Sequence, residues 1–209
     1  PFWAWNCELD PKLLEKEIDY LKEMGFGGFM MHPRVGMATP YLSEEYMDLV
    51  RTCVEKGKQN NMLAWLYDED KWPSGFAGGL NTKEEENRQK ALFITSFPYN
   101  DGTLVTEHDK AHAADRLPES KYYFVACFDV LLNEDSRLVS YKRIELADEI
   151  PAGHEKWFAY VEYATTSPYY NNQAYCDTLQ KSVIESFIKI THDAYKKHFK
   201  EEFGGVIPA

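Results

Sequence analysis

Strand-like and helix-like patterns alternate along the first 67 residues, and this alternation constrains the fold more than any other feature of the chain. Three short apolar runs have the length of buried strands, namely Phe2–Asn6, Gly28–Met31 and Met62–Tyr67. Asp10 before Pro11 is the pattern of a helix N-cap followed by proline at the first helical position, and Ser43 is placed to cap a second helix. Short strand–helix alternations are typical of parallel β/α architecture with right-handed crossovers.

The periodicity changes in the middle of the chain. From about residue 92 to residue 164, apolar residues recur mostly at every second position, with turn signals at Asn100–Gly102 and Asn133–Ser136. Helical spacing returns between Ile184 and Tyr195, and Val206–Ala209 has the composition of a fourth parallel strand. We therefore expect three segments: β/α units in residues 1–82, an inserted antiparallel β subdomain in 83–165, and a return to the parallel series in 166–209.

Polar and aromatic residues follow each of the three predicted parallel strands. The candidate substrate-binding residues are Asn6, His32, Arg34, Asp68, Glu69 and Trp72. Because the carboxyl ends of parallel strands meet at one edge of a sheet, we expect these side chains to project towards one rim, as in the active site of a β/α barrel. Carboxylates beside a flat aromatic ring suit a polyhydroxylated ligand such as a sugar.

Individual roles for these residues leave alternatives open. Arg34 has the planar donor fork that holds a carboxylate or a sugar hydroxyl, and His32 either transfers a proton or, as we favour, orients a ligand. Trp72 is either a stacking platform or the plug of its loop. A purely structural interpretation assigns the polar residues to caps, local hydrogen bonds and a solvated loop. The consecutive acids at 68–70 also suit Ca²⁺, but no EF-hand pattern is present, so we expect no metal and no cofactor.

Composition excludes several other classes of function. The formal net charge of −11 argues against a nucleic-acid surface, which needs clustered Lys and Arg. No apolar run approaches the roughly 20 residues that span a bilayer, so no membrane partner is expected. The four cysteines are far apart in the sequence, which favours free thiols over disulfides or a zinc site. With no leader pattern visible, the sequence slightly favours a cytoplasmic location.

Several of these motifs together resemble a family of enzymes. The segments are Pro1–Asn6, Gly25–Gly36, Tyr41–Ser43 and Tyr67–Gly79. They are similar to the start of the catalytic barrel in α-L-rhamnosidase-type glycoside hydrolases, family 106 and its relatives. The similarity extends well over about residues 1–80 and more loosely over 175–209.

The resemblance implies an α/β fold of the (β/α)8 TIM-barrel type, of which this chain holds the first three to four units and the inserted sheet. It implies hydrolysis of a glycosidic bond, in a rhamnoside or a related sugar, by two carboxyl groups. In such enzymes the catalytic pair comes from later strands, which implies a truncated chain that is inactive alone and whose catalytic residues are unknown. Half a barrel exposes sheet edges and apolar surface, so self-association is also expected.

Two other classes of function compete with this interpretation. The first is a non-catalytic carbohydrate-binding module that uses the aromatic residues of the inserted sheet as a stacking platform, namely Tyr122, Tyr123, Trp157 and Tyr160. The second is a metal-dependent hydrolase centred on the acids at 68–70. Loss of sugar binding on Trp157→Ala but not on Arg34→Ala favours the module, whereas calcium-dependent stability lost on Asp68→Asn favours the metal.

Overall fold

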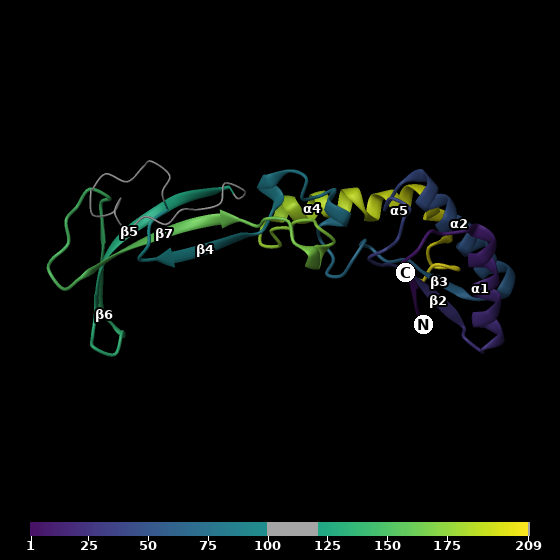
Figure 1. The fold of residues 1–209 in the computed structure, drawn as a ribbon. Coiled ribbons are helices and arrows are strands. Elements are labelled where there is room, and N and C mark those ends of the chain that lie inside the picture. Colours follow the sequence, from purple (N-terminus) through teal and green to yellow (C-terminus); the bar gives the residue numbers. More distant parts are fainter. Residues whose placement is uncertain (100–120, 209) are drawn as a thin grey trace. The chain divides into compact units, whose positions relative to one another are not determined.

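A computed structural model describes residues 1–99 and 121–208 of the chain. The chain divides into two compact units. We call Pro1–Arg88 with Thr166–Ala209 the parallel unit and Gln89–Thr165 the antiparallel unit (Figure 1). The structure thus places residues 83–88 with the parallel unit. The turn expected at Asn100–Gly102 lies outside the described residues.

The parallel unit contains a three-stranded sheet in the order β1-β2-β3, with all neighbours parallel. Its elements in chain order are β1 (Phe2–Trp5), α1 (Pro11–Glu23), β2 (Gly28–Pro33), α2 (Glu44–Asn60) and β3 (Leu63–Trp65). Both predicted N-caps are confirmed: the Asp10 side chain accepts from the Leu13 N–H, and the Ser43 side chain accepts from the Tyr46 N–H. Each cap satisfies a backbone donor that the first helical turn leaves free.

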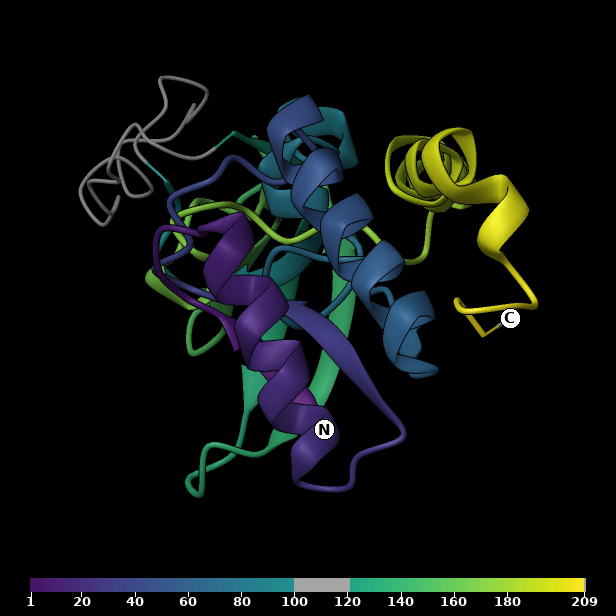
Figure 2. The same ribbon diagram turned by 90° about the vertical axis from the view of Figure 1, so that its right-hand side faces the viewer.

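Helices α1 and α2 cover one face of the sheet, and Figure 2 shows them side by side. Apolar residues at helical spacing, such as Leu14 and Ile18, pack there against alternate strand residues such as Phe29 and Met31. Strand side chains on the opposite face of the sheet are more exposed: Phe2 is 74% exposed and Trp65 is 36% exposed. The core of this unit therefore lies on the helical side of the sheet.

The predicted (β/α)8 barrel is wrong. The structure has a three-stranded parallel sheet and a separate four-stranded antiparallel sheet, with no barrel among the described residues. The expected fourth strand at Val206–Ala209 also does not form. The backbone curls back on itself instead, because the N–H of Gly204, at φ +79°, donates to the Ile207 carbonyl, and the N–H of Ile207 donates to the Glu202 carbonyl. Among the described residues, a single hydrogen bond of 2.8 Å, from the Ala64 N–H to the Val206 carbonyl, links this segment to β3.

The antiparallel unit contains strands in the order β4-β7-β5-β6. Their bounds are β4 (Lys90–Thr95), β5 (Tyr122–Leu132), β6 (Leu138–Ile144) and β7 (Glu155–Tyr163). The turn between β5 and β6 is the one predicted at Asn133–Ser136, and the Asn133 side chain accepts from the N–H groups of Asp135 and Arg137. Cys127, Phe158 and Tyr160 form the buried core of this unit.

The second segment of the parallel unit contains a long helical stretch. It comprises α4 (Lys181–Ile190), α5 (His192–Phe199) and the 3₁₀ turn Lys200–Glu202. Tyr195 and Phe199 on α5 join the same apolar core as α1 and α2.

Among the described residues, none of the helices has the length and the apolar composition that crossing a membrane requires. All four cysteines are free thiols, with Cys7 exposed and the other three buried.

Candidate functional site

The carboxyl ends of the three parallel strands form a rim on which most of the predicted residues lie. Asn6 follows β1 directly and Arg34 follows β2 directly, and the Arg34 N–H donates to the Trp5 carbonyl at 2.9 Å. Asn6 and Arg34 are both exposed. The loop after β2 lies close against β1: a Cβ at Gly36 (φ +103°) would meet the Asn6 carbonyl oxygen at 2.6 Å, so glycine is needed there.

His32 and Tyr67 meet at the centre of this rim. Their rings stack with centroids 4.0 Å apart and planes 21° apart, and His32 is 6% exposed. The His32 Nδ1 atom lies 2.9 Å from the Pro33 carbonyl oxygen, which accepts only, so Nδ1 carries the proton. In the neutral imidazole the Nε2 atom is then the acceptor. Burial and the carboxylate of Asp68 raise the pKa of the Tyr67 phenol.

The three consecutive acids go to three different places. Glu69 is fully buried, and its carboxylate accepts four backbone hydrogen bonds. The donors are the N–H groups of Asp70 (2.9 Å), Gly75 (2.9 Å), Ala77 (2.8 Å) and Gly78 (2.6 Å). Burial raises the pKa of Glu69 to about 7, although those four donors favour the charged form. The loop therefore folds around the Glu69 carboxylate. Both of its oxygens accept from backbone donors and are not directed at a ligand.

Asp68 and Asp70 take separate partners. One Asp68 oxygen accepts from the Ser74 hydroxyl at 2.6 Å, and the other lies 3.5 Å from the His192 Nε2 atom. Asp70 accepts from the Asn171 side chain at 2.9 Å, and burial raises its pKa. Within residues 1–99 and 121–208, no group of three or more His, Cys, Asp or Glu side chains could hold a metal ion. The divergence of the three acids removes the geometric basis of the calcium alternative.

Trp72 is an exposed ring and not the plug of its loop. It is 59% exposed and lies edge-on to Tyr169, with centroids 6.5 Å apart. Lys71 lies over the Tyr169 ring with its Nζ 5.3 Å from the centroid. The plug is Phe76, which is fully buried and packs edge-on against Tyr170. Trp72 and Tyr169 thus present an aromatic pair to solvent, and the sequence offered no signal for Tyr169.

A chain of buried hydroxyls holds the exit of β3. The Tyr195 hydroxyl donates to the Tyr67 carbonyl at 2.9 Å. Because its proton is used there, the Tyr46 hydroxyl, 2.9 Å away, donates to the Tyr195 oxygen. Burial raises the pKa of Tyr46 and Tyr195 well above the usual range, so both phenols stay protonated. This chain sets the backbone position from which Asp68 projects.

Asp68 opens into a pocket of about 620 Å³ within the parallel unit. Its walls come from the end of β3, from α5 and from residues 203–208. The lining residues are Trp65, Leu66, Tyr67, Asp68, His192, Tyr195, Lys196, Lys200, Phe203, Ile207 and Pro208. The sequence interpretation did not single out His192. The informative spacing is with Lys196 and Lys200, at i+4 and i+8.

The aromatic residues proposed as a platform in the inserted sheet do not share a surface. Tyr122 and Tyr160 pack into the core around Phe158, and Tyr160 is 2% exposed. Tyr123 pairs with Val161 and Trp157 pairs with Phe128, so Tyr123 and Trp157 lie on the opposite face. The split follows from the two-residue period of β7, which places Trp157 and Tyr160 on different faces.

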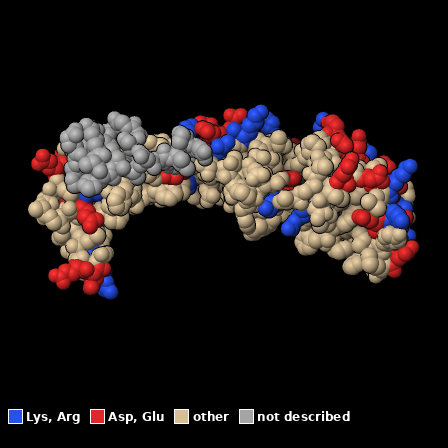
Figure 3. All heavy atoms as spheres, viewed as in Figure 1, with Lys and Arg blue, Asp and Glu red and all other residues tan. Residues whose placement is uncertain are grey.

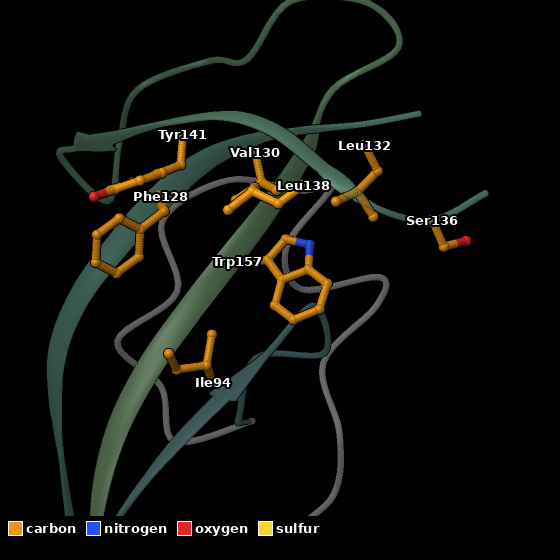
Figure 4. A pocket seen from close by; sticks show the side chains of 8 residues that line it. All are labelled: Ile94, Phe128, Val130, Leu132, Ser136, Leu138, Tyr141 and Trp157. Atoms are coloured by element: carbon orange, nitrogen blue, oxygen red, sulfur yellow. The ribbon is translucent and has the colours of Figure 1, made fainter. Parts of the chain in front are cut away.

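The face that carries Trp157 contains a pocket of about 450 Å³ (Figure 4). It is lined by Ile94, Phe128, Val130, Leu132, Ser136, Leu138, Tyr141 and Trp157. These side chains are almost wholly apolar, and the Trp157 Nε1–H already donates to Glu155 at 2.9 Å. Sugar sites need several convergent polar groups, which this pocket does not offer.

Comparisons with known proteins give one structural match. No protein-family model and no curated protein sequence matches the chain. The fold is similar to part of the structure of a rhamnosidase from Novosphingobium sp. PP1Y, with a TM-score of 0.54 and 9% sequence identity. The alignment covers 94% of this chain but 36% of that one, so the chain spans about a third of the rhamnosidase's length. At this identity the match establishes a likeness of fold alone.

Proposed function

We propose that this chain provides a sugar-binding site of a glycoside hydrolase that acts on a rhamnoside or a related sugar. The observation that carries the proposal is the position of Asp68, which opens beside His192 into a pocket at the end of a parallel strand. The likeness of fold to a rhamnosidase also supports the proposal. A pocket of about 620 Å³ has the size of a small-molecule site and combines apolar walls with a few polar groups.

The roles follow from the contacts of each residue. Asp68 accepts hydrogen bonds from sugar hydroxyls, and Ser74 orients it through the 2.6 Å hydrogen bond. Trp65 and Tyr67 offer ring faces to the apolar side of a sugar. His32 positions Tyr67 by stacking, and Glu69 shapes the loop from inside.

The outer rim supplies further contacts in the same proposal. Asn6 and Arg34 lie exposed after β1 and β2, where their side chains are available to hydroxyl groups. Trp72 with Tyr169 provides a second aromatic contact. Glycosidic hydrolysis needs two carboxyl groups across the bond. Of the acids at 68–70, only Asp68 lines the pocket, so we assign this chain sugar binding and at most one of the two carboxyl groups.

Sugar binding by the chain tests the proposal. Titration calorimetry with L-rhamnose and methyl α-L-rhamnoside should detect binding that Asp68→Asn weakens about tenfold or more, because a hydrogen bond to a charged acceptor contributes about 1.5–3 kcal/mol. Glu149→Gln, an exposed acid of the antiparallel unit, is the matched control and should leave the affinity unchanged. Absence of binding to these sugars and to a wider panel of monosaccharides would contradict the proposal.

A further inference from the structure

Three basic side chains form a row along one side of the pocket. His192, Lys196 and Lys200 stand four residues apart, and all three line it. Positions i, i+4 and i+8 share one face of a helix, where the like charges of Lys196 and Lys200 repel each other by a few tenths of a kcal/mol. This repulsion opposes the favourable interaction of cations with the C-terminal end of α5, so the helix itself neither requires nor excludes the row.

The two lysines of this row lack an acidic partner. Among the described residues, neither the Lys196 nor the Lys200 ammonium takes part in an ion pair or a hydrogen bond. Two other lysines of the parallel unit are paired closely: the Nζ of Lys56 lies 2.8 Å from Asp19, and the Nζ of Lys58 lies 2.5 Å from Glu202. Lys197, next to Lys196 on α5, is unpaired among the described residues like the two lysines of the row. The chain has 34 acids against 23 Lys and Arg, and Figure 3 shows acidic and basic side chains interspersed over the α1 and α2 side of the parallel unit. Two adjacent unpaired lysines are thus not explained by a shortage of carboxylates.

Charge is distributed unevenly within the pocket. The Asp68 carboxylate lies 3.5 Å from His192, at the start of α5. Lys196 lies one turn and Lys200 two turns further along. A helical rise of 1.5 Å per residue puts them about 6 and 12 Å from His192, measured along the helix axis. An anionic group is repelled at the Asp68 end and attracted at the lysine end. Hydroxyl groups suit the Asp68 end, where a carboxylate accepts and an imidazole donates or accepts.

The pocket also has two partly exposed aromatic rings. Trp65 and Phe203 line the pocket and remain 36% and 41% exposed. The Trp65 ring lies tightly over Gly28, where an added Cβ would meet its Cζ3 atom at 2.4 Å. Glycine at this position therefore lets the indole lie against the sheet, and a partly exposed indole can stack on the apolar face of a sugar.

From this arrangement we infer that the pocket takes an acidic sugar, with the carboxylate of a uronic acid at Lys196 and Lys200 and its hydroxyls at Asp68 and His192. This inference rests on the proposed function and specifies its substrate class. The separation of about one helical turn between His192 and Lys196 matches a ligand whose charge and hydroxyls lie on opposite sides of a sugar ring, and Lys200 lies one turn further on.

Paired ligands that differ only at C6 provide the test. Titration calorimetry compares D-galacturonate with D-galactose and D-glucuronate with D-glucose, with acetate as a bare carboxylate. We expect each uronate to bind at least tenfold more tightly than its neutral partner and far more tightly than acetate, since hydrogen bonds to charged groups contribute about 1.5–3 kcal/mol. Lys196→Gln combined with Lys200→Gln should abolish the preference, and the corresponding double arginine variant should retain it.

Lys197→Gln is the matched control, because Lys197 is a neighbour in the same helix that does not line this pocket. It should leave the preference intact. If neutral sugars bind as well as uronates and the double glutamine variant changes nothing, the inference fails while the proposed function stands. Equal affinity for acetate and uronates also overturns it. If neither the uronates nor the neutral sugars bind to the wild-type protein, the proposed function itself fails.

Discussion

The Tyr195 hydroxyl donates a 2.9 Å hydrogen bond to the Tyr67 carbonyl, which ties α5 to the exit of β3. The two residues are separated by the whole antiparallel unit in the sequence. Tyr46 extends the connection from α2 by donating to the same hydroxyl oxygen. The position of Asp68 at the pocket therefore depends on three elements that meet only in the folded chain.

Tyr195→Phe should lower the free energy of unfolding by about 1–3 kcal/mol, since it removes a donor from a carbonyl and leaves the buried Tyr46 hydroxyl without its acceptor. Urea denaturation measures the change. Tyr141→Phe is the control, because Tyr141 is 68% exposed, and it should change stability by less than about 0.5 kcal/mol. Equal stability of the Tyr195→Phe variant and the wild type would show that the hydroxyl chain does not hold the strand exit.

Glu69→Gln should destabilise the parallel unit, because both oxygens of a carboxyl group can accept from the backbone N–H groups, whereas the amide NH₂ group cannot accept and would face two of these donors. The cost should also depend on pH. The folded-state pKa of about 7 lies above the ordinary value of 4.5, so the folded state holds a proton that the unfolded state releases between these values. Wild-type stability from this residue is therefore greatest below about pH 4.5 and falls as the pH rises towards 7.

Chemical denaturation of both proteins at pH 5, 6 and 7 measures this effect. The difference in unfolding free energy between wild type and Glu69→Gln should shrink as the pH rises, by up to about 3 kcal/mol in total, since one pKa unit corresponds to about 1.4 kcal/mol. Other titrating groups cancel in the difference. A difference that grows with pH would mean that the four backbone donors outweigh burial and keep Glu69 charged.

Phe76→Ala and Trp72→Ala should separate structure from binding in one loop. Phe76 is fully buried, so its truncation should cost about 3–5 kcal/mol of stability. Trp72 is 59% exposed, so Trp72→Ala should cost less than about 1 kcal/mol yet weaken sugar binding. Thermal unfolding and calorimetry on both variants measure the two effects. A Trp72→Ala variant as unstable as Phe76→Ala would show that Trp72 is a structural residue.

Local chemistry made several features of this fold predictable. The N-caps at Asp10 and Ser43 follow from side-chain acceptors placed before apolar helical repeats, and the turn at Asn133–Ser136 follows from residues that bond their own backbone. Two-residue and 3.6-residue periods distinguish the strands of the antiparallel unit from the helices of the parallel unit. These signals depend on neighbours within a few residues, so a single sequence carries them.

The arrangement of the sheet and the site was decided by contacts between distant segments. The expected fourth strand failed because backbone bonds around Gly204 closed a turn, and a barrel did not form although local β/α alternation is compatible with one. The divergence of Asp68 and Glu69 depends on which backbone donors the folded loop presents. The row of His192 and Lys196 is readable from its spacing, but only packing of α5 beside β3 brings it to Asp68. Periodicity specifies which face of an element is buried, whereas the partner of that face depends on packing energies summed over the whole chain.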